Sequence, residues 1–324
     1  MNILICGGAG YIGSHMAKML AAHGHEVTVF DNLSTGHLEA VKWGTFVQGD
    51  LLNREDLQKL FHSNNFDSVM HFSAKSLVGE SMANPGLYYS NNVAGTINLL
   101  NSMIEYGVDK FVFSSSAATF GTPVTEFIDE THPQVPINPY GETKLMVEKI
   151  LRDFDQANGL SSVSLRYFNA AGADPEGEIG ESHNPESHLI PNVLKSVLVN
   201  NAKLKVFGDD YETKDGTCVR DYIHINDLCT AHLQAIEYMS ANKGAAGFNL
   251  GNGTGFSIFE IIKAAEKVAG KTIPYDVEKR RAGDPPLLVA NSGLIKKTFG
   301  WTPQFASIDS IIETAWRWHK DQKF

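Results

Sequence analysis

Short apolar runs alternate with longer amphipathic segments through the first half of the chain. Residues 3–6 are apolar at every position and lead into glycines, which is typical of a strand buried in a parallel sheet. Residues 11–23 then carry apolar side chains at a helical period, with Ile12, Met16 and Leu20 on one face. A second apolar run at 27–30 ends in Asp31. This pattern predicts a strand–helix–strand unit of about thirty residues.

The alternation continues to about residue 170. The expected strands cover residues 45–47, 68–72, 110–114 and 162–167, and the expected helices cover 53–61, 91–105 and 140–158. Repeated strand–helix units favour a doubly wound α/β fold with a mostly parallel sheet and helices on both faces. We therefore expect a Rossmann domain over residues 1–170.

The pattern changes after residue 170. Residues 170–186 are rich in glycine, proline and acidic residues and predict a long loop. Beyond it we expect helices at 189–200, 225–238, 257–269 and 308–319, and strands at 205–207 and 247–250. These elements predict a smaller mixed α/β domain over residues 171–324, with segments from about 215–250 returning to the first sheet.

Composition narrows the functional class. The 324 residues include 27 basic and 37 acidic ones, a net charge of -10, so general nucleic-acid binding is not expected, although a few arginines still suffice for a small anion. Three widely spaced cysteines and scattered histidines predict neither a disulfide framework nor a metal site. The N-terminus has no signal-like segment and no apolar run spans a membrane, so a cytoplasmic protein is expected.

A glycine-rich turn follows the first strand. Residues 8–13 read Gly-Ala-Gly-Tyr-Ile-Gly, and Asp31 follows Gly13 by 18 residues at the end of the second strand. Glycines let a pyrophosphate approach the backbone, and the helix N-terminus offers free N–H groups. Asp31 can accept hydrogen bonds from a ribose and would repel a 2′-phosphate, which favours NAD over NADP. The alternative is a tight turn with a structural aspartate.

A second motif joins a tyrosine and a lysine. Tyr140 and Lys144 lie one turn apart on a predicted helix, downstream of serines 114–116 at a strand end. A tyrosine with the usual pKa near 10 is about one part in a thousand phenolate at pH 7, so a base would need its pKa lowered by roughly three units. Tyr106 and Tyr275 also precede a lysine by four residues, but without serines; the alternative is a packing tyrosine beside a solvated lysine.

Longer motifs extend these signals over nearly the whole chain. They include GGAGYIGSH at 7–15, FDNLSTG at 30–36, GD at 49–50, SLVGES at 76–81, NNVAGT at 91–96, FSSSAATFG at 113–121, PYGETK at 139–144, RYFNAAGA at 166–173, HLIPNVL at 188–194, VFGDDYETKDGTCVRDYIH at 206–224 and RRAGDPP at 280–286. With these motifs the chain resembles the extended short-chain dehydrogenase/reductase family, and within it the enzymes that epimerise nucleotide sugars.

The resemblance implies a tightly bound NAD and a catalytic set of Ser116, Tyr140 and Lys144. The implied cofactor-binding residues are Gly7, Gly10, Tyr11, Ile12, Gly13, Asp31, Asn32, Asp50, Leu51, Phe72, Ser73, Ala74, Asn92, Ser114, Tyr140, Lys144, Tyr167 and Phe168.

The resemblance also implies a UDP-sugar substrate. Arg220 and Arg281 would hold the diphosphate, which suits guanidinium geometry, although in isolation they would be read as surface ion pairs. The full set of implied substrate-binding residues is Ser116, Asn169, His188, Leu189, Val206, Phe207, Arg220, Arg281, Asp284 and Leu288. Leu189, Val206 and Phe207 would line the uridine pocket, and Asp284 would hold its ribose.

The implied activity is NAD-dependent inversion at C4 of a UDP-hexose by a homodimer, paired through helices near Asn91 and Tyr140. Ala117 and Ala118 stand where dehydratases of this resemblance class carry an acidic pair, which argues against dehydration. The small Leu288 leaves a UDP-N-acetylhexosamine open as a substrate. A nucleotide-sugar reductase or decarboxylase and a non-catalytic NAD-binding protein are further alternatives.

Overall fold

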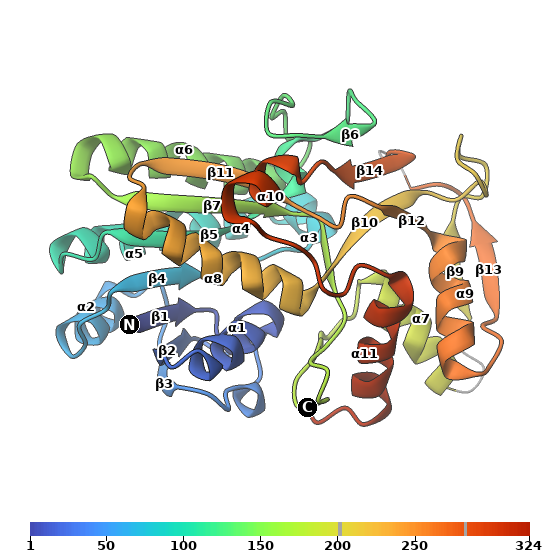
Figure 1. Cartoon of the computed structure of the whole chain (residues 1–324), viewed down its shortest axis with the longest axis horizontal. Helices are drawn as coiled ribbons and strands as arrows, with labels where there is room; N and C mark the ends of the chain where they lie inside the picture. The colour runs from blue at the N-terminus through green and yellow to red at the C-terminus, as the bar shows by residue number, and fades with distance from the viewer. Residues whose placement is uncertain (200–202, 282–283) are drawn as a thin grey trace. The chain divides into compact units, whose positions relative to one another are not determined.

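The computed structural model describes residues 1–199, 203–281 and 284–324. It shows the expected α/β architecture, and its contacts divide the chain into two compact units (Figure 1). Unit 1 comprises Met1–Gly121, Pro133–Arg166 and Cys229–Phe248, and unit 2 comprises Thr122–His132, Tyr167–Leu228 and Asn249–Phe324. Residues 122–132 therefore leave the expected first domain.

A seven-stranded sheet organises unit 1. Its strands follow the order β11-β7-β5-β4-β1-β2-β3, and β1 pairs in parallel with both β2 and β4, so that Cys6 lies opposite Phe30 and His71. The expected parallel sheet is confirmed. The strands are β1 (Asn2–Cys6), β2 (Glu26–Asp31), β3 (Thr45–Gln48), β4 (Ser68–His71), β5 (Lys110–Ser116), β7 (Ser161–Tyr167) and β11 (Ala245–Leu250).

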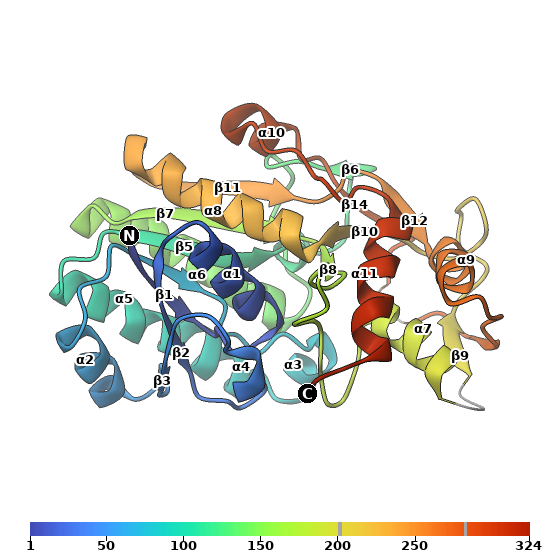
Figure 2. The same cartoon turned by 60° about the horizontal axis from the view of Figure 1, so that its bottom comes forward.

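Helices cover both faces of this sheet. On one face α2 (Arg54–His62), α5 (Gly95–Glu105) and α6 (Pro139–Asn158) bury leucines, methionines and phenylalanines against the strands. Figures 1 and 2 show α1 (Tyr11–Ala22) and α8 (Ile225–Ala241) side by side on the opposite face. The start of α6 is well specified, because Asn138 Oδ1 accepts from Gly141 N and Pro139 occupies the first turn.

Irregular helical turns precede α5, where the sequence predicts one helix over 91–105. The chain forms α3 (Val78–Ala83), α4 (Pro85–Tyr88) and a π-helical turn η2 (Tyr89–Ala94) before α5 begins. A π-helical turn of this kind is rare and occurs mostly at functional sites. Two 3₁₀ turns, η1 (Leu38–Ala40) and η3 (Ala117–Thr119), complete the elements of unit 1.

Unit 2 contains smaller sheets and its own core. The larger sheet has the order β12-β10-β14-β6, with β8 also on β10, and β9 pairs with β13. Its strands are β6 (Phe127–Ile128), β8 (Asn169–Ala171), β9 (Leu204–Phe207), β10 (Val219–His224), β12 (Gly255–Ser257), β13 (Tyr275–Glu278) and β14 (Leu287–Ala290), and its helices are α7 (Leu189–Leu198), α9 (Ile258–Ala269), α10 (Gly293–Phe299) and α11 (Ile308–Lys320). The β6–β14 pairing explains why 122–132 joins unit 2.

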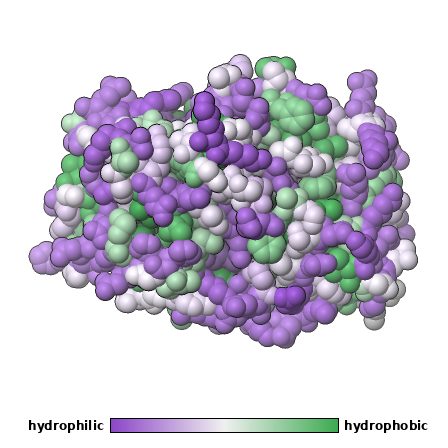
Figure 3. Space-filling view, viewed as in Figure 1, coloured by the Kyte–Doolittle hydropathy of each residue, from purple (hydrophilic) through white to green (hydrophobic). Residues whose placement is uncertain are grey.

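The predicted helix over 189–200 ends at Leu198, and its last expected residue, Asn200, lies outside the described residues. The face drawn in Figure 3 is mostly hydrophilic, with smaller hydrophobic areas between the hydrophilic ones. None of the helices within 1–199, 203–281 and 284–324 has the length and apolar character needed to cross a membrane.

Candidate active site

Two glycines shape the turn after β1. Gly7 has a φ of +81°, and a Cβ there would lie 2.6 Å from the backbone nitrogen of Ser73. A Cβ on Gly13 would collide with the Gly7 carbonyl and lie 2.7 Å from the Gly8 Cα. Gly10 is the N-cap of α1, and no side chain caps that helix. The first turn of α1 is therefore suited to receive an anion such as a pyrophosphate.

A cleft lies where the ends of the central strands of unit 1 meet. Half of the predicted cofactor-binding residues contribute to its lining: Gly7, Gly10, Asp31, Asn32, Asp50, Leu51, Phe72, Ser73 and Ala74. Ser34, Thr35 and Gly36 line it as well. They are absent from the predicted set, although these small residues come only three to five positions after Asp31 in the sequence. The glycine turn, uncapped helix and acidic strand end fit a dinucleotide.

Asp31 holds the glycine turn against β2. Its Oδ2 accepts from Ala9 N at 3.0 Å, and its Oδ1 accepts from Leu33 N at 2.8 Å. Burial raises the pKa of this carboxyl despite both hydrogen bonds. A carboxylate offers about four acceptor positions, so the structural contacts leave capacity for a ribose. The structural and the ribose-binding interpretations of Asp31 are therefore compatible.

Asn92, predicted to bind the cofactor, cross-links protein segments instead. Its Oδ1 accepts from Lys75 N at 2.9 Å, and its Nδ2 donates to the Lys75 carbonyl and to Thr143 Oγ1, each at 3.0 Å. The π-helical turn η2 places Asn92 to make these contacts. Both amide atoms thus fix the cleft wall at Lys75 and the first turns of α6.

Tyr140, Lys144 and two of the serines come together at the end of β5. Lys144 Nζ donates to the Ser114 carbonyl at 2.6 Å and lies 5.8 Å from the ring centroid of Tyr140. The Ser116 side chain hydrogen-bonds to Tyr140. The helix therefore brings the hydroxyl and the ammonium to one face, as the spacing of Tyr140 and Lys144 predicts.

Burial is the largest influence on the pKa values of Tyr140 and Lys144. It raises the pKa of Tyr140, and the Ser116 hydrogen bond offsets only part of this rise. Burial also lowers the pKa of Lys144 to about 7, although the Glu148 charge acts in the opposite direction. In the cofactor-free protein, burial therefore opposes the fall in the Tyr140 pKa that a nearby ammonium and a positively charged nicotinamide are expected to produce together. Additional positive charge beside Tyr140 is needed to form a phenolate at neutral pH.

The lowered pKa of Lys144 predicts an unusual pH dependence of stability. Between pH 7 and the ordinary lysine pKa, the unfolded chain binds a proton that the native lysine does not, so the free energy of unfolding rises with pH. Relative to Lys144→Met, the cofactor-free protein should gain about 2 kcal/mol between pH 7 and pH 9. Urea unfolding of both proteins at pH 7, 8 and 9 measures this difference; parallel curves would contradict it.

Glu148 belongs to a buried network absent from the predicted site. Its Oε1 accepts from Ser115 Oγ at 2.5 Å, and Arg166 makes a two-pronged ion pair with the carboxylate at 2.8 and 2.9 Å. Gln134 Nε2 also donates to Oε2 at 3.2 Å. Glu148 lies one turn after Lys144 on α6, and that spacing was an available signal. The network ties the lysine-bearing helix to β5 and β7.

The predicted diphosphate-binding arginines lie in unit 2. Arg220 lies 3.2 Å from Asp284 Oδ1 through its NH2 and donates from NH1 to the Val219 and Pro285 carbonyls. The Arg281 guanidinium lies 4.1 Å from the ring centroid of Phe207. Leu288 pairs with Arg220 between β14 and β10. The structure thus brings Arg220 together with Asp284 and Leu288, and it pairs Arg281 with Phe207.

Other predicted substrate-binding residues already make packing contacts or hydrogen bonds within unit 2. Val206 is completely buried in the hydrophobic core, so the expectation that its side chain lines a uridine pocket is wrong for this structure. Leu189 is partly buried against the same core. Asn169 Nδ2 donates to the Asp221 carbonyl at 2.9 Å, and His188 Nδ1 bonds to Glu181. Two of the predicted cofactor-binding residues lie nearby in the sequence: Tyr167 ends β7 as a buried residue, and Phe168 follows it.

Comparison with known proteins agrees with this site. A model of the NAD dependent epimerase/dehydratase family matches residues 3–251. A "UDP-glucose 4-epimerase" of Halalkalibacterium halodurans is 50% identical over 321 residues, which cover 99% of this chain and 96% of that protein.

Two solved structures with closely similar folds are described with bound ligands. The UDP-glucose 4-epimerase of Brucella ovis in complex with NAD has a TM-score of 0.95 and 47% identity, with 97% of each chain covered. That of Bifidobacterium longum in complex with NAD+ and UDP has a TM-score of 0.93 and 37% identity, with 99% of each chain covered. The glycine turn, the Ser–Tyr–Lys group and these matches together show that the chain belongs to the NAD dependent epimerase/dehydratase family.

Proposed function

We propose that this chain is an isomerase that interconverts UDP-galactose and UDP-glucose by NAD-dependent inversion at sugar C4. The grouping of Ser116, Tyr140 and Lys144 at the carboxyl end of β5 carries the proposal. Relatives at about half identity over the full length bear the name of this activity. Unit 1 would hold NAD, and unit 2 would hold the UDP-sugar.

The residues of unit 1 divide the acid–base work. Tyr140 would remove the proton of the sugar 4-hydroxyl, and Ser116 would share that proton through its hydrogen bond to the phenol. Lys144, held by the Ser114 carbonyl, would supply positive charge that favours the phenolate. NAD, held by the cleft of unit 1, would supply reversible hydride transfer at sugar C4. The 4-keto sugar would have to rotate between the two hydride transfers.

The residues of unit 2 would bind the nucleotide. Arg220 and Arg281 would hold the diphosphate, Phe207 would pack against uridine, and Asp284 would accept from its ribose. Asp284 lies 3.2 Å from Arg220 in the free chain and so orients the guanidinium. Contacts directed at the nucleotide suit an epimerase, because the hexose itself must be free to rotate.

Dehydration is not favoured by the local structure. Ala117 and Ala118 form the 3₁₀ turn η3 directly after Ser116, which caps that turn by accepting from Ala118 N at 3.1 Å. Neither alanine can donate or accept a proton through its side chain. The position therefore has no acid–base pair for eliminating water.

The activity is tested by incubating the purified protein separately with UDP-galactose, UDP-glucose and their N-acetyl forms, without added NAD. We expect interconversion of the two hexoses and release of NAD on denaturation. Conversion of the N-acetyl pair would support the wider specificity inferred from Leu288. A 4,6-dehydrated product, or no turnover even with added NAD, would contradict the proposal.

Arg220→Met should raise the Kd for UDP by roughly 10²-fold, because a charge-assisted two-pronged contact contributes about 1.5–3 kcal/mol. Isothermal titration with UDP measures the change. Arg280→Met is the matched control, since Arg280 pairs with the exposed Asp210 and stacks on Tyr211. Equal loss in both variants would show that general charge, and not a specific site, attracts the nucleotide.

We also infer a cytoplasmic homodimer. The three cysteines are buried free thiols, which suits a reducing compartment. Met82, Leu87 and Tyr89 are exposed apolar residues in α3, α4 and η2, the turns that precede α5 in the chain. Dimerisation through α5 and α6 would give a four-helix bundle. Light scattering coupled to gel filtration tests the dimer; a monomer at micromolar concentration would contradict it.

A further inference from the structure

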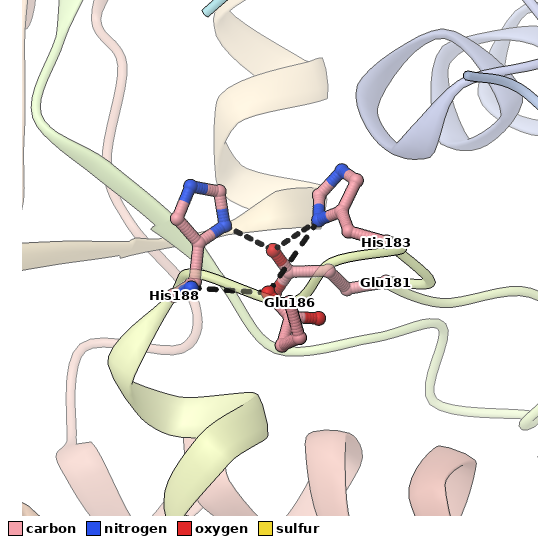
Figure 4. A group of neighbouring side chains, drawn as sticks. All are labelled: Glu181, His183, Glu186 and His188. Carbon is pink, nitrogen blue, oxygen red and sulfur yellow. Dashed lines mark hydrogen bonds and ion pairs between the residues drawn. The ribbon is translucent and has the colours of Figure 1, made fainter. Parts of the chain in front are cut away.

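A compact group of two histidines and two glutamates lies in unit 2, in the segment before α7. Glu181, His183, Glu186 and His188 come from an eight-residue stretch in which Glu-Ser-His occurs twice. Figure 4 shows the four side chains converging, each histidine presenting its Nδ1 to a carboxylate. One donor atom from each residue lies within 4.8 Å of the other three. None of the proposed catalytic steps uses this cluster.

The donor atoms have the spacing of a small coordination sphere. His183 Nδ1 lies 3.2 Å from Glu181 Oε1 and 3.7 Å from Glu186 Oε1, and His188 Nδ1 contacts Glu181 Oε1. A tetrahedral zinc ion with ligand bonds of about 2.0–2.1 Å places its donor atoms about 3.3 Å apart. Only small movements of the side chains would separate the donors around a single ion.

The backbone around the cluster is already fixed. The Glu181 carbonyl accepts from the indole Nε1 of the buried Trp318 at 2.9 Å. Glu186 Oε1 accepts from the backbone nitrogens of Ser187 and His188, at 2.9 and 3.0 Å. His188 is in turn the N-cap of α7. An ion binding here would pay little ordering entropy, because the ligands are held in place before it arrives.

The burial of the carboxylates favours a cation that replaces their lost hydration. The side chains of Glu181 and Glu186 are 4% and 6% exposed, and Glu186 Oε2 is buried without a hydrogen-bond partner, 3.6 Å from Lys195 Nζ. The imidazoles of His183 and His188 are 32% and 52% exposed, which gives an ion a route from solvent.

We propose that Glu181, His183, Glu186 and His188 form a binding site for one divalent transition-metal ion, with zinc as its best-suited occupant. Two imidazoles, which would release their Nδ1 protons on binding, and two carboxylates form a donor set preferred by zinc and its neighbours over magnesium or calcium, which favour oxygen ligands alone. The two carboxylates balance the ionic charge. The site joins the loop before α7 to the N-cap of that helix and so has a structural role.

The test uses the full-length protein without a histidine tag, stripped with a chelator and titrated with Zn²⁺ by calorimetry. We expect one ion per chain. The double variant His183→Ala/His188→Ala should bind it at least about tenfold more weakly, because even groups that only support ligands alter affinity 10–100-fold. Mg²⁺ and Ca²⁺ should not bind comparably. Equal zinc binding by the wild type and the double variant would overturn the site. Displacement of the bound zinc by Mg²⁺ or Ca²⁺ would overturn it as well.

Two matched variants separate ligation from disruption. His62→Ala removes an exposed histidine at the end of α2, and Lys195→Met removes a charge next to Glu186 but no ligand. Both should retain the ion. Equal loss in Lys195→Met would contradict ligation. If the double variant does not fold, the test is zinc-edge anomalous diffraction from wild-type crystals soaked in Zn²⁺. An anomalous peak within about 2.0–2.2 Å of the four donor atoms would support the site. The absence of a peak there would overturn it.

Discussion

Tyr140→Phe should reduce kcat by roughly 10²–10⁴-fold, the usual contribution of a positioned acid–base group. The change removes only the hydroxyl that hydrogen-bonds with Ser116. The ring would keep its edge contact with Tyr88, whose ring centroid lies 6.5 Å away. The fold should therefore survive, and so should NAD binding, since Tyr140 lies outside the lining of the dinucleotide cleft.

The measurement is single-turnover conversion of UDP-galactose, together with the amount of NAD released on denaturation. Tyr106→Phe and Tyr275→Phe are matched controls, because each of these partly exposed tyrosines precedes a lysine by four residues but lies outside the serine-bearing strand end. Both controls should retain wild-type turnover. Substantial activity in Tyr140→Phe would show that another group removes the proton and would exclude the mechanism proposed above.

The first half of the fold is readable from sequence because its signals are local. The alternation of buried strands and amphipathic helices sets the parallel sheet, and the glycine turn with Asp31 sets the cleft. The transfer of residues 122–132 to unit 2 has no such local signal. β6 has only two residues, and its partner β14 lies near the other end of the chain, so no local pattern marks the pairing.

The positions of the site residues are easier to predict from the sequence than their pKa values. Sequence spacing correctly put Tyr140 and Lys144 together, but it carries no measure of how completely each is buried. In the structure desolvation outweighs the neighbouring groups and moves the pKa of both away from the expected direction for a tyrosinate–ammonium pair. The Glu-Ser-His repeat matches no established metal motif, so the sequence assigned His188 only to the substrate and gave no role to His183.

Buried charge also governs the second large effect expected, which concerns Glu148. The carboxylate of Glu148 accepts hydrogen bonds from Ser115, Gln134 and Arg166, so the NH2 group of glutamine in Glu148→Gln would face other donors. The substitution would also leave the charge of Arg166, whose side chain is only 8% exposed, without its partner. We expect a loss of about 3–5 kcal/mol in the free energy of unfolding, as for other broken buried ion pairs. The exposed pair of Lys203 and Asp276, at a similar 2.9 Å, is the control; Asp276→Asn should cost less than about 1 kcal/mol.

A double replacement distinguishes an unpaired charge from a loss of packing. Glu148→Gln/Arg166→Met removes both charges, so it should recover a large part of the lost stability in urea unfolding, because buried pairs replaced by apolar groups are often neutral. Recovery of stability should not restore turnover fully. Glu148 normally raises the pKa of Lys144, so its removal leaves less ammonium at neutral pH, and the deficit in kcat should shrink as the pH is lowered. A double variant no more stable than Glu148→Gln would show that the network acts through shape and hydrogen bonding and not through its charges.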